Sequence, residues 1–147
     1  MVGAIQSPAS RVTAVHRTYL QISGAGKANV SEPKMMLGPM RGGAVRLAPP
    51  AEELALCEGI ETGLSVLQEA RLATWACLSA GGIRNVILPP LPMAGLVVIA
   101  ADHDVNGVGQ KAAEEAGERF VREGRRVKIL LPPEPGTDFN DLLRQVA

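Results

Sequence analysis

Acidic side chains follow two apolar segments of this sequence, directly after the point where each segment ends. Glu58 comes after the run Leu54–Cys57, and the pair Asp102 and Asp104 comes after Leu96–Ala101. Carboxylates that gather at one place repel one another unless a cation lies between them. Mg²⁺ is the natural partner, because it is a hard ion that takes oxygen ligands, usually one or two carboxylates and several waters. The spacing therefore predicts a magnesium site that positions phosphate groups and neutralises their charge.

A third acidic group follows the apolar run Val127–Leu131, after a proline-rich loop. It consists of Asp138 and Asp141. The carboxyl ends of parallel strands meet at one edge of a sheet, where ligands bind in folds of this kind. All three groups are therefore expected at the same edge. The alternative is that Asp102, Asp104 and Asp138 only cap helices and begin turns.

The elements that must position these carboxylates alternate between strands and helices. Four apolar runs are strand candidates: Leu54–Cys57, Thr74–Leu78, Leu96–Ala101 and Val127–Leu131. Helical periodicity predicts helices over Glu61–Ala70, Val108–Glu123 and Phe139–Val146, and Ile83–Leu88 fits a short helix or strand. This alternation predicts an α/β fold, an open and mostly parallel sheet with helices on both faces.

The first third of the chain has a different composition. Residues 11–50 are expected to form a small β arm, and residues 51–147 the α/β domain. Residues 1–10 carry no charge and are expected to be a disordered start or a vector-derived remnant. Residues 1–48 hold six basic side chains and one acidic one, a net charge of +5 in a chain whose total is zero. The arm is thus suited to phosphate, or is simply a solvated basic surface.

Several segments together resemble the Toprim domain family. Leu56–Gly63, Val97–Asp104 and Thr137–Asp141 are similar to its three signature segments, in the same order. Val15–Leu20 and Lys34–Pro39 resemble the strand arm that precedes the Toprim core in phage- and plasmid-borne primases and primase-helicases. The resemblance covers roughly residues 11–145 and implies a Toprim (Rossmann-like) sheet.

The resemblance also implies roles for individual residues. Glu58 corresponds to the family's general acid/base, and Asp102 and Asp104 to its Mg²⁺ ligands, with Mn²⁺ as a substitute. Glu58 and Asp138 are expected to join the metal site. Many relatives have Lys before that last Asp, where this chain has Thr137.

Five residues are candidates for contact with phosphate or nucleic acid. Arg17, Lys34 and Arg41 supply positive charge from the arm. Gly81 follows a strand in Ser-Ala-Gly-Gly, and Gly107 opens the long helix, where backbone N–H groups can approach a phosphate. A plain turn explains each glycine equally well.

The resemblance implies Mg²⁺-dependent phosphodiester chemistry on nucleic acid. The best match is nucleotidyl transfer, the synthesis of primers by a DNA primase-like protein of a mobile element. Its partners would be a single-stranded DNA template, nucleotides and a helicase. The chain has no GxxxxGK[ST] motif, and its two Cys and two His are isolated in the sequence and lack the CxxC pairing of a zinc site, so a fragment or minimal relative is expected. No apolar run is long enough for a membrane span, and a cytoplasmic location is expected.

Three alternatives stay open at this point. The first is a Toprim nuclease that cleaves DNA or RNA. The second is a non-catalytic module that binds metal or phosphate, or recruits a partner. The third is a response-regulator receiver, which also gathers acids at one edge of an α/β sheet. Receivers place paired acids after the first strand, whereas here the first core strand is followed by Glu58 alone.

Overall fold

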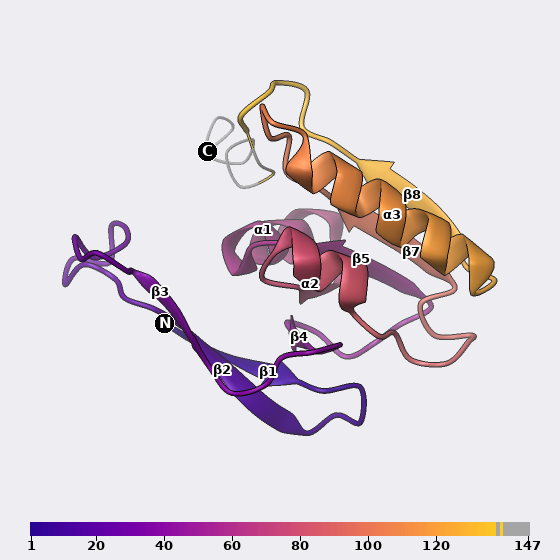
Figure 1. Ribbon diagram of the computed structural model, residues 1–147, viewed down its shortest axis with the longest axis horizontal. Helices are drawn as coiled ribbons and strands as arrows, with labels where there is room; N and C mark the ends of the chain where they lie inside the picture. The colour runs from indigo at the N-terminus through magenta and orange to yellow at the C-terminus, as the bar shows by residue number, and fades with distance from the viewer. Residues whose placement is uncertain (138, 140–147) are drawn as a thin grey trace.

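A single sheet of eight strands runs through the computed structural model, which describes residues 1–137 and 139 (Figure 1). In chain order the strands are β1 (Val2–Gln6), β2 (Val12–Thr18), β3 (Lys34–Leu37), β4 (Ala44–Arg46), β5 (Glu53–Cys57), β6 (Ala73–Ala76), β7 (Leu96–Ala100) and β8 (Arg126–Leu130). Their order across the sheet is β3-β2-β1-β4-β6-β5-β7-β8. The last four strands along the chain pair in parallel, and the first four join the sheet through antiparallel pairs.

Three helices cover the two faces of the parallel half (Figure 1). They are α1 (Ile60–Ala70), α2 (Ala80–Asn85) and α3 (Val108–Arg122). Strand β5 shows why both faces are apolar. Leu54 and Leu56 pack into the cluster formed with α2 and α3, whereas Ala55 and Cys57 pack into the clusters on the α1 side. The apolar runs that form β5 and β7 are therefore strands buried on both faces, whereas β8 lies at the edge of the sheet and is mostly exposed. The predicted α/β fold is confirmed.

The start of the chain is a strand, so the expectation of a disordered start over residues 1–10 is wrong. Strand β1 lies between β2 and β4, and Ile5 is fully buried. Ile5 and Ala14 share one apolar cluster with Ile60 of α1 and Ala100 of β7. The sequence did not reveal β1 because the strand is only five residues long and because β4, one of its two partners, lies far along the chain. The boundary predicted near residue 50, between the β arm and the α/β domain, thus falls within one continuous sheet.

Replacement of Ile5 by Val is expected to lower the free energy of unfolding by about 1 kcal/mol, because it removes a fully buried methyl group. Val2→Ala in the same strand is the control and is expected to change it by less than about 0.5 kcal/mol, since Val2 is 69% exposed. Urea unfolding followed by circular dichroism measures both. Equal stability of the Ile5→Val variant and the parent chain would show that β1 is not part of the folded core.

The remaining predicted elements agree with the structure to within a few residues. The segment Ile83–Leu88, which fitted a helix or a strand, contributes to α2. The predicted helix Phe139–Val146 lies outside the described residues apart from Phe139, and Asp138 and Asp141 also lie outside them. Within the described part of the chain, none of the helices has the length and apolar character needed to cross a membrane.

Candidate active site at the carboxyl ends of the parallel strands

The register of β5 and β7 brings the first two acidic groups together. The strands are parallel neighbours, with Cys57 opposite Ala100, so Glu58 and Asp102 leave the sheet side by side. Both residues line a cavity of about 160 Å³ at this edge. His16 of β2 and Lys34 of β3 line the same cavity. Two acidic residues of the parallel half and two basic residues of the arm therefore border one space.

The Glu58 carboxyl group is in an environment that disfavours its charge. Its pKa is raised to about 7, first by burial and then by the negative charges of Asp102 and Asp104. The Ala80 N–H and the Arg84 guanidinium act in the opposite direction. Glu58 Oε1 is buried and has no hydrogen-bond partner among the residues that the structure describes. A carboxylate in this state is stabilised by an added cation.

The raised pKa of Glu58 has a consequence for stability in the absence of metal. A carboxyl group with a higher pKa in the folded than in the unfolded state stabilises the fold at low pH. That stability is lost as the pH rises from about 4.5 to about 7. Glu58→Gln has no carboxyl group and does not lose this stability. In EDTA at pH 7.5 the free energy of unfolding of the variant is therefore expected to exceed that of the parent chain by about 1–2 kcal/mol, a figure that allows for the screening of charge by water.

Urea unfolding of both proteins at pH 5 and pH 7.5 measures the effect. Glu69→Gln, at an exposed position of α1, makes the same change of charge and serves as the control. If the stability difference between the parent chain and Glu58→Gln is the same at both pH values, Glu58 has an ordinary pKa.

The start of α3 holds the second carboxylate of the Asp-x-Asp pair. The Gly109 N–H donates to Asp104 Oδ2 at 2.9 Å, and Gln110 Nε2 donates to the Asp104 carbonyl at 2.9 Å. A Cβ on Gly109 would lie 2.9 Å from Asp104 Oδ2 and 3.2 Å from Glu58 Oε1. The absence of a side chain at position 109 thus lets both carboxylates approach the same point of the helix.

These carboxylates suit a divalent ion that keeps most of its waters. Within residues 1–137 and 139, no three Asp, Glu, His or Cys side chains are gathered closely enough to enclose a metal by themselves. Mg²⁺ typically takes one or two protein carboxylates and completes its octahedron with water and phosphate oxygens. The buried Oε1 of Glu58 beside Asp102 fits such an ion. Asp138 lies outside the described residues. The chain nevertheless comes back to this edge just before it, because the His103 N–H donates to the Thr137 carbonyl at 3.1 Å.

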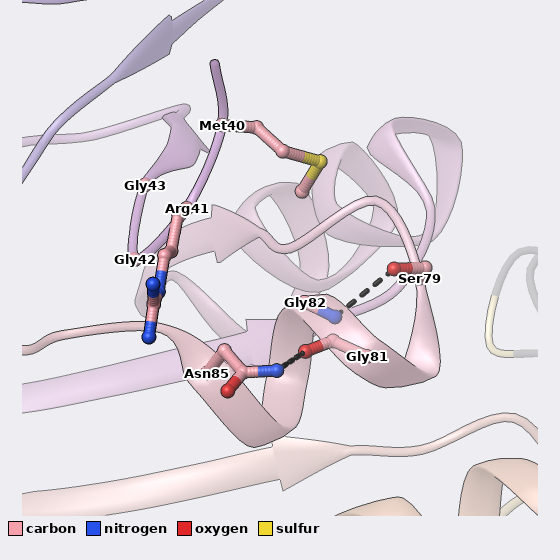
Figure 2. Close-up of a pocket in the computed structure, with 8 residues that line it drawn as sticks. All are labelled: Met40, Arg41, Gly42, Gly43, Ser79, Gly81, Gly82 and Asn85. Carbon is pink, nitrogen blue, oxygen red and sulfur yellow. Dashed lines mark hydrogen bonds between the residues drawn. The ribbon is translucent and has the colours of Figure 1, made fainter.

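A second pocket, of about 430 Å³, brings together two of the predicted phosphate contacts (Figure 2). Arg41, from the loop between β3 and β4, and Gly81 of α2 both line it. Lys34 lines the acidic cavity instead. Gly107 is the N-cap of α3, with φ +71°, while Arg17 is not among the residues that line either pocket. The five candidate residues for phosphate contact therefore lie at separate places and do not form one cluster.

The turn from β6 into α2 lies between the two spaces. Leu78 lines the acidic cavity, and Ser79 lines the second pocket. Ser79 Oγ accepts the Gly82 N–H at 3.0 Å, which caps α2, and Asn85 Nδ2 donates to the Gly81 carbonyl at 2.7 Å (Figure 2). The cap orients the first turn of α2, from which the Ala80 N–H reaches Glu58.

Sequence reasoning missed two residues that shape the acidic site. In the sequence Gly109, like Gly107, marks only the start of the long helix, where a phosphate could approach, and Arg84 carries no signal. Arg84 lowers the pKa of Glu58 and also pairs with Glu115 of α3. No sequence pattern identifies either role, because both depend on how α2 and α3 pack on the sheet.

The fold is shared with the catalytic domains of bacterial primases. A DNA primase domain from Pseudomonas aeruginosa aligns over 97% of this chain and 46% of its own, with 20% identity and a TM-score of 0.58. The Aquifex aeolicus primase, with its zinc-binding and RNA polymerase domains, aligns over 98% and 36%, with 18% identity and a TM-score of 0.63. A DnaG primase catalytic domain bound to single-stranded DNA aligns over 98% and 48%, with 18% identity and a TM-score of 0.60. The chain thus spans less than half the length of each.

Family comparisons divide the chain close to the end of β4. Residues 1–47 match a family described only as a domain of unknown function. A comparison with curated proteins gives no match. Residues 53–147, more than half of the chain, match the Toprim domain. With this match, and with the fold of primase catalytic domains around the acidic edge, the chain belongs to the Toprim domain family.

Proposed function

We propose that this chain is the nucleotidyl-transfer core of a DNA primase-like protein, which synthesises primers on a single-stranded DNA template with Mg²⁺. The observation that carries the proposal is the placement of Glu58. Its carboxyl group is half-buried, has a pKa raised to about 7 and shares a cavity with Asp102. The bound cation would lower this pKa, so that Glu58 is the ionised carboxylate that can take a proton at neutral pH.

In the proposed reaction, Glu58 takes the proton of the attacking 3′-hydroxyl group. The hydroxyl oxygen forms a bond to the α-phosphorus of a nucleoside triphosphate, and the bond from that phosphorus to pyrophosphate breaks. Asp102 and Asp104, with Glu58 and Asp138, would hold the Mg²⁺. When bound, this ion neutralises charge on the phosphate oxygens. Basic residues of the arm and of the second pocket, above all Arg41, would hold the template strand.

The proposal is tested with the 147-residue chain, a single-stranded template and labelled nucleotides. Incorporation of nucleotides with Mg²⁺ or Mn²⁺ supports it. Its loss in Asp102→Asn, together with weaker binding of Mn²⁺ measured by electron paramagnetic resonance, assigns the reaction to the acidic site. Cleavage of a labelled strand without nucleotides would instead identify a nuclease. Binding of Mn²⁺ without either reaction would identify a non-catalytic module.

Nucleotidyl transfer is proposed ahead of the nuclease alternative, because the three primase structures described above are similar to nearly the whole chain, arm included. The arm matters here, since β1 to β4 continue the sheet of the Toprim core. We further propose that the protein acts in the cytoplasm, belongs to a mobile element and works beside a helicase. Copurification of the chain with a helicase expressed from the same element tests the last point.

A further inference from the structure

The two aspartates of the acidic site lie in a loop without regular structure. Residues 101–104 follow β7 and belong to neither a strand nor a helix. At the start of the loop the Ala101 N–H donates to the Leu130 carbonyl at 3.0 Å, which extends the pairing of β7 with β8 by one residue. Carboxylates bind a metal ion well only when the backbone that carries them is held in place. The positions of Asp102 and Asp104 therefore depend on contacts that this loop makes with other segments.

His103, between the two aspartates, makes three such contacts. Its N–H donates to the Thr137 carbonyl at 3.1 Å, and its carbonyl accepts the Gly136 N–H at 2.5 Å. Its ring Nδ1 lies 2.8 Å from the Pro132 carbonyl. Because a carbonyl can only accept a hydrogen bond, Nδ1 carries the hydrogen and is the donor. All three partners belong to residues 132–137, the loop that follows β8 and lies beside the segment between β7 and α3 (Figure 1). We call this loop the strap.

The strap is itself fixed at both ends. Pro132, at its start, is fully buried. At its end the Thr137 hydroxyl donates to the Glu134 carbonyl at 2.6 Å, and the Thr137 N–H donates to the same carbonyl at 3.4 Å, which closes a turn. The resemblance to Toprim domains predicts Lys at this position, whereas the Thr of this chain closes the turn. His103 is thus bonded to a loop that has a fixed shape of its own.

The loop between β7 and α3 is held on different sides by its three successive residues. Asp102 is among the residues that line the acidic cavity, whereas His103 is not. Asp104 Oδ2 accepts the Gly109 N–H at the start of α3. The ring of His103 is engaged by the strap instead. A residue placed in this way influences a metal ion in the cavity through the backbone that it holds.

We propose that His103 is a positioning residue of the acidic site: its ring fixes the loop between β7 and α3 to the strap and thereby sets the positions of the Asp102 and Asp104 carboxylates. The inference rests on the proposed function, because it assumes that these carboxylates hold the metal. Groups that orient metal ligands contribute about 10–100-fold to metal affinity. Loss of the ring contact is expected to have an effect at the lower end of this range, since both backbone hydrogen bonds of His103 remain.

The test measures the affinity of the whole chain for Mn²⁺ by electron paramagnetic resonance, without nucleotide or nucleic acid. His103→Leu has no ring donor and is expected to weaken Mn²⁺ binding about tenfold. His103→Asn places an amide nitrogen near the position of Nδ1 and is expected to bind within about threefold of the parent chain, whereas His103→Gln places it near Nε2 and is expected to behave as His103→Leu. Rescue by Asn alone assigns the effect to the hydrogen bond with the strap.

A second substitution tests whether His103 acts through the strap. Thr137→Val opens the turn of the strap and is expected to weaken Mn²⁺ binding about threefold, while Thr137→Ser keeps the hydroxyl group and binds as the parent chain does. In the His103→Leu background, Thr137→Val is expected to have a smaller effect, because two residues that act through one contact are not additive. Full additivity would show that the strap does not link them and would overturn the proposal.

Thr13→Val is the control for a general loss of structure. Thr13 Oγ1 donates to the Pro39 carbonyl at 3.0 Å, and Thr13 is not among the residues that line the acidic cavity. The variant therefore loses a hydrogen bond of the same kind, from a side chain to a carbonyl of a distant segment, and is expected to leave Mn²⁺ binding unchanged. Circular dichroism checks that every variant is folded.

The outcomes distinguish positioning from its alternatives. If His103→Asn loses Mn²⁺ binding as His103→Leu does, the ring acts other than through the strap, for example as a ligand, and the inference is wrong. If the parent chain binds Mn²⁺ and His103→Leu binds it as tightly, only this inference fails. Equal weakening by Thr13→Val would show a general effect and also overturn it. If the parent chain binds no Mn²⁺, the proposed function fails first, and the inference fails with it.

Discussion

Glu58→Gln is expected to reduce nucleotide incorporation by about 10³-fold while leaving the fold intact. General acid–base catalysis contributes about 10²–10⁴-fold, and Gln can neither take a proton nor bind Mg²⁺ as a carboxylate does. The amide is nearly the same size and has no charge to bury, so the variant is expected to be better folded than the parent chain at neutral pH. Loss of activity combined with gain of stability is what a functional carboxylate in an unfavourable environment produces.

Primer synthesis on a single-stranded template measures the effect, with folding checked by circular dichroism. Glu69→Gln makes the same change at the other end of α1 and is expected to retain full activity. A direct role in proton transfer predicts that kcat falls more than the affinity for nucleotide. If Glu58→Gln incorporates nucleotides within about tenfold of the parent rate, an effect too small for a lost acid–base group, the catalytic assignment is wrong.

The parallel half of the fold could be predicted because its signals are local. An apolar run such as Leu96–Ala101 marks a strand buried on both faces, and the periodicity of Val108–Glu123 marks a helix. The prediction that the acids after these strands lie close together needs only the rule that parallel strands have their carboxyl ends at one edge of the sheet. That rule correctly predicted that Glu58 and Asp102 come together, and the structure adds that they line one cavity.

The rest depends on contacts between distant segments. Strand β1 is short and alternates weakly, and its place inside the sheet depends on its pairing with the distant strand β4 as well as with the neighbouring β2. His16 looked like one of several basic arm residues, because its burial is visible only once the arm packs against α1. The role of Gly109 is equally invisible in the sequence, since its closeness to two carboxylates arises from the approach of α3 to the ends of β5 and β7. Sequence patterns predict single helices and strands, whereas these features arise where helices and strands pack against one another.

The turn before α2 gives the second large effect. Gly82→Ala is expected to lower the free energy of unfolding by about 3 kcal/mol, the upper end of the usual cost of overpacking. A Cβ at this position would lie 1.8 Å from the Cys77 carbonyl oxygen, which belongs to the backbone and cannot rotate away. The first turn of α2 would have to move, and with it the Ala80 N–H that stabilises the Glu58 carboxylate. The variant that folds is therefore expected to have a still higher pKa at Glu58.

Gly81→Ala is the matched control, one residue earlier in the same helical turn. Among the residues that the structure describes, its Cβ would meet Ser79 Oγ alone, at 3.8 Å, and Ala is a better helix former than Gly by about 1 kcal/mol. Gly81→Ala is therefore expected to keep or raise stability, whereas Gly82→Ala lowers it. Thermal unfolding of the two variants measures the contrast, and similar melting temperatures would mean that the turn is not held as the structure shows. Because Gly81 also lines the second pocket, weaker binding of an oligonucleotide by the stable Gly81→Ala variant would show that this pocket contacts the strand.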